Sequence, residues 1–258
     1  KDAIEPYKHE YKDVYAVIDW ISKQEWSNAK VGMYGGSYNG FSQWASLKEK
    51  VHPALKTIIP SVSAAPGIDV PMGNNIFFNF PYKWIPYVTN NKFLDNDANF
   101  DRDRWNNLEN EWFTSGKSYN KMDSIDGTPS PVFQEWISHP SYDAYWQNMI
   151  PYKDDFSHIN IPILSTTGYY DDGQRGAMYY YLEHLKYKPE AGDLLVFPSG
   201  HPEYLTEDGK PYLHGVMPSY NKNKFLSRMY WQKYQKGTDE WYEKEKEFGK
   251  DIWHSMQP

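Results

Sequence analysis

The chain has 258 residues, of which 27 are Lys or Arg and 34 are Asp or Glu, so its formal net charge is −7. No basic block stands out, which makes nucleic acid and anionic membrane surfaces poor candidate partners. No apolar run approaches the roughly 20 residues that a membrane span needs. The absence of cysteine excludes a disulfide scaffold and a zinc–thiolate site, but it fits the cytosol, the periplasm and the exterior alike, so the compartment stays open.

The first 60 residues alternate between helix and strand patterns. Apolar residues at the one-faced helix spacing predict a helix over 11–24, and a short apolar strand follows over 30–34. A glycine-rich turn then leads into a second helical pattern over 41–47. Another strand is predicted over 55–59, closed by Pro60. This alternation is typical of an α/β protein with a parallel sheet.

The regular pattern stops at about residue 61 and returns at about residue 158. Asn, Asp, Pro and aromatic residues crowd this stretch, and only short helical patches are predicted, over 101–114 and 131–137. So long an irregular stretch inside a compact domain is usually a lid or an inserted subdomain. After it we predict a strand over 161–166, a helix over 173–186, a strand over 193–197 and a helix over 222–236. The expected organisation is therefore an α/β core over 1–60 and 158–240, a mainly helical cap over 61–157, and a linker over 241–258.

A candidate serine nucleophile lies between the first predicted strand and the second predicted helix. The segment Gly35-Gly36-Ser37-Tyr38-Asn39-Gly40 occupies the place where a nucleophile elbow is expected, at a sharp strand-to-helix turn. In the usual Gly-x-Ser-x-Gly pattern the second glycine would stand at Asn39, whereas here it stands at Gly40. In such a turn the backbone N–H after the serine, that of Tyr38, is one donor of the oxyanion hole. The alternative interpretation is an ordinary glycine-rich turn before a helix.

Candidate partners for this serine follow in the order Ser, Asp, His that α/β-hydrolases use. Asp171 and Asp172 lie in the loop after the strand over 161–166, and His201 lies in the loop after the strand over 193–197. Loops at the carboxyl ends of parallel strands carry the chemistry of open α/β sheets. The other seven histidines do not combine this order with this location.

The motifs resemble those of the α/β-hydrolase family that includes cocaine esterase, the α-amino-acid ester hydrolases, glutaryl acylases and the X-Pro dipeptidyl-peptidases. The similar segments are Val31-Gly32-Met33-Tyr34-Gly35-Gly36-Ser37-Tyr38, His52-Pro53-Ala54-Leu55-Lys56, Pro140-Ser141-Tyr142-Asp143-Ala144-Tyr145-Trp146, Gly168-Tyr169-Tyr170-Asp171 and Leu195-Val196-Phe197-Pro198-Ser199-Gly200-His201. In the last of these, Phe197 and Ser199 replace two residues of the run that usually precedes the family's histidine.

The resemblance implies a serine hydrolase of esters or amides, with Ser37 as nucleophile, Asp171 as orienting acid and His201 as base. Asp172 is the competing acid. No cofactor and no metal are expected. The implied partner is a small ester or a short peptide, and a homo-oligomer is compatible with the sequence.

The family's second oxyanion donor resembles a tyrosine hydroxyl upstream of the elbow, for which the first 36 residues offer no strand and loop. We therefore expect the chain to be the middle of a longer protein that also carries a C-terminal β-jelly-roll domain.

Two alternatives belong to other functional classes. Alternating oxygen ligands from Asp95 to Asp103 suggest a calcium loop, but Phe100 stands where glycine is needed and Asn106 where a bidentate glutamate belongs. A solvated acidic turn is the simpler interpretation. A catalytically inactive hydrolase fold could instead bind a ligand through its 46 Trp, Tyr and Phe residues. The presence of all three triad positions favours an enzyme over that alternative.

Overall fold

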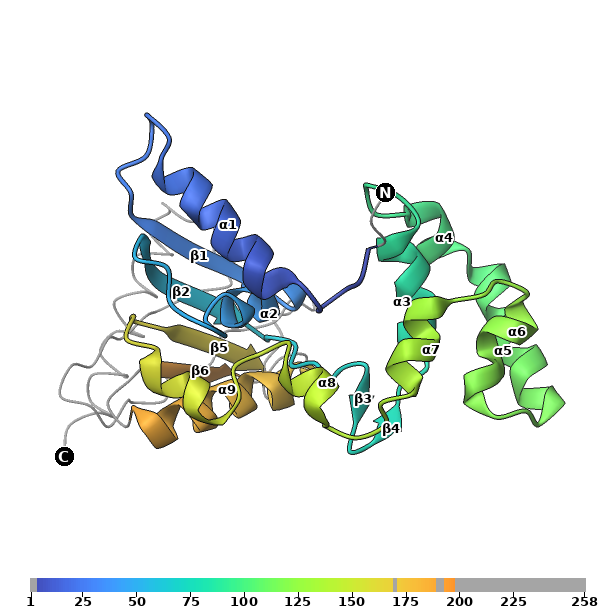
Figure 1. Cartoon of the computed structure of the whole chain (residues 1–258). Helices are drawn as coiled ribbons and strands as arrows, with labels where there is room; N and C mark the ends of the chain where they lie inside the picture. The colour runs from blue at the N-terminus through green and yellow to red at the C-terminus, as the bar shows by residue number, and fades with distance from the viewer. Residues whose placement is uncertain (1–3, 169–170, 189–192, 198–258) are drawn as a thin grey trace, which may run out of the picture. The chain divides into compact units, whose positions relative to one another are not determined.

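The structure, a computed structural model, describes residues 4–168, 171–188 and 193–197 (Figure 1). The chain divides into two compact units, the first made of residues 1–167 and 172–194 and the second of residues 168–171 and 195–258. The serine turn and the inserted helices belong to the first unit. Gly168, Asp171 and the last residues of strand β6 belong to the second. The helix predicted over 222–236 lies outside the described residues.

A parallel sheet forms the centre of the first unit. Strands β1 (Val31–Gly36), β2 (Leu55–Ser61) and β5 (Leu164–Gly168) are neighbours in that order (Figure 1). Gly36 pairs with Ser61 and Ser61 pairs with Thr166, so the carboxyl ends of the three strands meet at one edge. The predicted α/β class with a parallel sheet is confirmed.

One predicted strand end was wrong. Strand β2 does not stop before Pro60 but continues to Ser61, with Pro60 opposite Gly35 of β1. Proline removes one backbone donor, but its fixed φ is compatible with an extended chain. The extra residue matters because Ser61 supplies a carbonyl to the serine turn.

The helices and the last strand of the sheet region lie close to their predicted ranges. Helix α1 (Glu10–Ser22) precedes β1, and helix α2 (Tyr38–Ala45) connects β1 to β2. Helix α9 (Gln174–Tyr187) follows β5 and leads to strand β6 (Asp193–Phe197). None of the described helices combines the length and the apolar character that a membrane span would need.

The insertion between β2 and β5 is mainly helical. It contains α3 (Phe80–Thr89), α4 (Asn96–Phe100), α5 (Arg102–Ser115), α6 (Met122–Asp126), α7 (Pro131–Ile137) and α8 (Ala144–Gln147), the 3-10 helices η1 (Tyr119–Lys121) and η2 (Lys153–His158), and an antiparallel pair of short strands, β3 (Met72–Gly73) and β4 (Ile76–Phe77). Helices α5 and α7 match the two predicted patches. The domain boundaries at residues 61, 158 and 241 stay predictions.

The aspartates of the suggested calcium loop have a structural use. Asp95 and Asp101 cap helices α4 and α5, because their side chains accept hydrogen bonds from the N–H groups of Ala98 and Arg104. Ser, Thr, Asn and Asp are preferred at this position because they satisfy otherwise unpaired N–H groups. Within the ranges that the structure describes, no three His, Asp or Glu side chains are grouped as a metal site.

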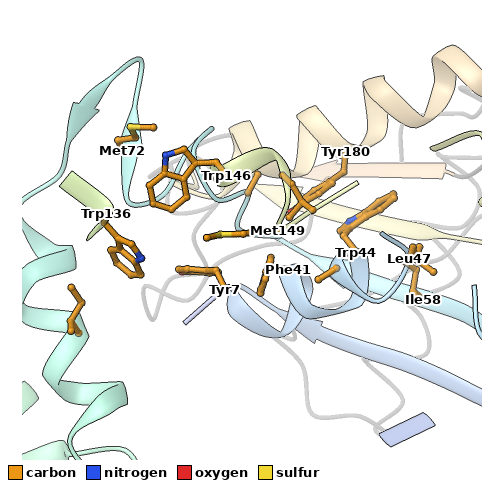
Figure 2. Close-up of a cluster of buried hydrophobic side chains, with 14 of the residues drawn as sticks. Tyr7, Phe41, Trp44, Leu47, Ile58, Met72, Trp136, Trp146, Met149 and Tyr180 are labelled. Carbon is orange, nitrogen blue, oxygen red and sulfur yellow. The ribbon is translucent and has the colours of Figure 1, made fainter. Parts of the chain in front are cut away.

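Aromatic contacts join the sheet region to the insertion. Trp44 of α2 stacks on Tyr180 of α9 with ring centroids 4.8 Å apart. Tyr7, just before α1, lies between Phe41 of α2 and Trp136 of α7, at centroid distances of 4.8 and 5.8 Å (Figure 2). Rings at these distances add about 0.5–1.5 kcal/mol per pair beyond the burial of their area. Aromatic side chains therefore pack helix α2, which follows the serine turn, against α9, and Tyr7 against α2 and α7.

Candidate active site

Ser37 lies at the junction of β1 and α2 in an unusual backbone conformation. Its φ of 57° and ψ of −120° place it in a region that residues other than glycine rarely occupy. Such a conformation costs about 1–3 kcal/mol and persists only where the surrounding structure imposes it. The Ser37 side chain is exposed. Both features are those that the elbow pattern predicts for a serine at this turn, and the role of Ser37 as nucleophile stays a prediction.

Hydrogen bonds hold the Ser37 backbone from two sides. Its N–H donates to the Ser61 carbonyl at 3.0 Å. Its carbonyl accepts from the N–H groups of Gly40, Phe41 and Ala64 at 3.0, 2.9 and 3.3 Å. The first two bonds start helix α2, whereas the bonds to Ser61 and Ala64 come from the end of β2 and the segment after it. The strained turn is therefore fixed by its own helix and by the neighbouring strand.

Gly40 explains why the second glycine comes one position later than usual. A Cβ at this position would lie 2.6 Å from Ser63 Oγ and 2.9 Å from the Ser61 carbonyl oxygen. Asn39, by contrast, is exposed, so a side chain fits at this position. Helix α2 thus approaches the segment after β2 most closely at Gly40, and this close approach requires a residue without a side chain.

We expect Gly40→Ala to lower the free energy of unfolding by about 1–3 kcal/mol, the usual cost of forcing an extra carbon into a packed site. Urea denaturation followed by tryptophan fluorescence measures this change. Gly32→Ala on β1 is the control, because its nearest neighbour is the Thr57 methyl group at 3.3 Å, a side-chain atom that can shift. Equal stability losses in the two variants would contradict the importance of the close approach at Gly40.

The side chain of Tyr38, the residue after the serine, is held by the first residue of α1 and by the segment before it. Its hydroxyl donates to the Glu10 carboxylate and accepts from the Tyr7 N–H at 2.9 Å. Glu10 also accepts from the N–H groups of Tyr7 and His9, at 3.2 and 3.1 Å. Burial raises the pKa of Glu10, and the backbone N–H groups act in the opposite direction. The ring of Tyr38 packs on Tyr7 with centroids 4.8 Å apart.

The backbone N–H of Tyr38 is available for a ligand. Among the described residues, no oxygen accepts a hydrogen bond from it. It belongs to the first turn of α2, where N–H groups have no partner within the helix and the helix dipole favours negative charge. An N–H in this place can stabilise an anion that forms next to Ser37.

A groove of about 610 Å³ opens beside Tyr38 and Asn39. Its lining includes the acidic residues Glu5, Glu10 and Asp13 and the aromatic residues Trp84 and Tyr87 of α3. This volume falls within the roughly 300–1,000 Å³ that is typical of small-molecule sites. The groove places space for a ligand next to the serine turn.

The two candidate acids follow strand β5 as predicted. The Asp171 N–H donates to the Gly168 carbonyl at 3.3 Å, and the Asp171 side chain is half-buried. Asp172 is exposed and directly precedes Gly173, the N-cap residue of α9. The choice of Asp171 over Asp172 stays a prediction. His201 lies outside the described residues, so its role also stays a prediction.

Asp69 is a buried acid that the sequence pattern did not reveal. It lies in the segment after β2 with 8% of its surface exposed. Its two oxygens accept from the N–H groups of Ala65 and Gly176, each at 2.7 Å. Burial raises the pKa of Asp69 to about 6, while the two N–H groups and Arg175 act in the opposite direction. Neither Asp69 nor Glu10 stands in a recognisable motif, and only the three-dimensional contacts identify them.

Comparison with known proteins places the chain in a family. Residues 3–203 match the model of the X-Pro dipeptidyl-peptidase (S15) family. A 60-residue stretch is 37% identical to the cocaine esterase of Rhodococcus sp. (strain MB1 Bresler), which is 23% of this chain and 10% of that enzyme.

Solved structures show a related fold. An aminopeptidase from a marine sediment Thaumarchaeota archaeon superposes with a TM-score of 0.55 at 23% identity, over 79% of this chain and 34% of that one. A CocE/NonD family hydrolase from Staphylococcus aureus gives a TM-score of 0.49 at 24% identity, over 76% of this chain and 29% of that one. The chain thus spans about a third or less of the length of these relatives. The match over most of its residues and the parallel sheet establish that the chain belongs to the X-Pro dipeptidyl-peptidase (S15) family of α/β-hydrolases.

Proposed function

We propose that the chain carries the catalytic core of a serine hydrolase that cleaves ester or amide bonds through an acyl-enzyme. The observation that carries this proposal is the exposed Ser37 in a strained strand-to-helix turn beside the available N–H of Tyr38. A turn that serves only to connect two elements has no need of such strain, whereas a nucleophile that must project from the sheet does. Membership of a hydrolase family supports the same conclusion.

In the proposed reaction, Ser37 Oγ attacks the carbonyl carbon of the substrate while His201 accepts the hydroxyl proton. The resulting oxyanion receives a hydrogen bond from the Tyr38 N–H. His201 then donates the proton to the leaving alcohol or amine, and the acyl group stays on Ser37 until water releases it by the same steps. Asp171 orients the imidazole and stabilises its charged form. The chemistry requires no cofactor, and the groove beside Tyr38 has room for a small ester or a short peptide.

A fluorophosphonate probe tests the nucleophile directly, because an activated serine displaces its fluoride and becomes phosphonylated. The full-length protein is incubated with the probe, digested and examined by mass spectrometry. We expect one adduct, on the peptide that contains Ser37. Hydrolysis of p-nitrophenyl acetate and of Gly-Pro-p-nitroanilide then separates an esterase from an X-Pro peptidase. An adduct on another serine, or none, would refute the assignment.

We expect the hydroxyl group of Tyr38 to contribute to kcat indirectly, by supporting the oxyanion donor. Tyr38→Phe removes the hydroxyl that joins Glu10 to the helix start, so the oxyanion donor loses part of its support. Complete loss of an oxyanion donor costs about 10²–10³ in kcat; the N–H itself remains in the variant, so we expect a smaller loss of about 10-fold. Steady-state hydrolysis of p-nitrophenyl acetate measures it.

Tyr34→Phe is the matched control for this experiment. Tyr34 lies on β1, three residues before Ser37, and 86% of its surface is exposed. Loss of its hydroxyl should leave kcat within about twofold, because substitutions at such surface positions usually change little. If both tyrosine variants behave alike, the contact between Tyr38 and Glu10 has no part in catalysis.

A further inference from the structure

The side chain of Asp69 joins two segments that are far apart in the sequence. Oδ1 accepts from the N–H of Ala65, and Oδ2 accepts from the N–H of Gly176, 107 positions further along the chain. Ala65 lies in the segment after β2, and Gly176 lies in the first turn of α9. One buried carboxylate therefore ties the segment after β2 to the start of α9.

Each tied segment leads to a candidate catalytic residue. Residues 61–65, which we name the support loop, hold the Ser37 backbone through the Ser61 carbonyl and the Ala64 N–H. The Ala64 carbonyl in turn accepts from the hydroxyl of Tyr180 on α9, at 2.9 Å. On the other side, α9 has Gly173 as its N-cap, two residues after Asp171.

The geometry is specific for an aspartate opposite a glycine. A Cβ on Gly176 would overlap with Asp69 Oδ2 and with the Ser63 carbonyl, so α9 can approach the support loop only with glycine at this position. Both carboxylate oxygens act as acceptors, which neither an amide nor an apolar side chain can reproduce. A carboxylate is also favourable at a helix N-terminus, where the unpaired N–H groups carry partial positive charge. The two hydrogen bonds and the favourable position at the helix N-terminus offset the free energy that is lost when a carboxylate is buried.

We propose that Asp69 is a positioning residue for hydrolysis, which fixes the first turn of α9 to the support loop that holds the Ser37 backbone. The proposal rests on the proposed function, because it takes Ser37 as the nucleophile. Asp69 itself does not touch the substrate. It acts by limiting the movement of two backbone segments that must keep one relative position during the reaction.

The test is Asp69→Asn, which replaces one acceptor oxygen by an NH₂ donor that faces a backbone N–H. We expect kcat for p-nitrophenyl acetate to fall by about 10- to 100-fold, the scale of loss for a small misplacement of catalytic groups. KM should stay within about twofold, because the groove is not altered. Hydrogen–deuterium exchange should become faster in peptides that cover residues 61–65 and 173–177.

Asp123→Asn is the matched control. Asp123 is also 8% exposed and accepts from the Ser130 N–H at 3.4 Å, but it lies on α6 in the insertion. This variant should lose stability while its kcat stays within about twofold. If Asp123→Asn lowers kcat as much as Asp69→Asn does, the effect is a general result of lost stability and the proposal is wrong.

A second variant covers the case in which Asp69→Asn does not fold. Asp69→Glu keeps both acceptor oxygens on a longer side chain, so it should fold and show a lower kcat with KM unchanged; an unchanged kcat would overturn the proposal. Exchange rates in Asp69→Asn that equal those of the unmodified protein would show that the tie itself is absent. Failure of the probe to label Ser37 in the unmodified protein would instead refute the proposed function, and with it the catalytic role of Asp69.

Discussion

Ser37→Ala should reduce the hydrolysis of p-nitrophenyl acetate by about 10⁴- to 10⁶-fold, as removal of a serine nucleophile does in other hydrolases. The reason is that alanine cannot form the acyl-enzyme, while the Tyr38 N–H and the groove remain to bind the substrate. Initial rates measured with the full-length protein give this loss. Labelling by the fluorophosphonate should disappear in the same variant.

Ser37→Gly separates the chemistry of this position from its conformation. Glycine adopts positive φ without steric cost, so the variant should be as inactive as Ser37→Ala but more stable than it, by an amount within the roughly 1–3 kcal/mol attributed to such strain. Ser42→Ala, on the helix α2 that follows Ser37, is the control for general effects of losing a hydroxyl. Labelling that survives Ser37→Ala would show that another residue is the nucleophile.

The elements that surround the serine turn could be predicted from the sequence because their signals are local. Strand β1, the glycines and helix α2 follow one another within 15 residues, and each has the periodicity or the turn residue that its conformation needs. Helix α3 could not be predicted in this way. It contains Pro81 and Pro86, which normally end a helix, and here Pro81 lies in its first turn.

The residues that support the site depend on contacts between distant segments. Glu10 meets Tyr38 across 28 positions, and Asp69 meets Gly176 across 107. In the sequence Glu10 stands at the start of an amphipathic helix and Asp69 stands in an irregular stretch, so both have the appearance of ordinary surface acids. Their burial and these long-range contacts arise only when the helices pack on the sheet. Local patterns therefore identify the candidate nucleophile but not the groups that hold its turn in place.

The two adjacent aspartates should differ sharply in their effect on catalysis. In the proposed mechanism, Asp171→Asn replaces the group that accepts the imidazole N–H of His201, so the imidazole is left in the wrong tautomer to accept the proton of Ser37. In a serine protease this change lowers kcat by about 10⁴ while the geometry is retained. We expect a loss of that order for Asp171→Asn. Hydrolysis of p-nitrophenyl acetate measures it, and circular dichroism shows whether the fold is kept.

Asp172→Asn is the matched control, because it makes the same chemical change one residue later. Asp172 is exposed, whereas Asp171 is half-buried and donates its N–H to the end of β5. An exposed acid before a helix contributes at most about 1 kcal/mol through the helix dipole, so kcat should stay within about fivefold by that limit. The kcat of His201→Ala gives the residual rate of a site without its base. If the kcat of Asp172→Asn falls to that residual rate while Asp171→Asn stays active, the orienting acid is Asp172. Equal losses would mean that both carboxylates act on the imidazole.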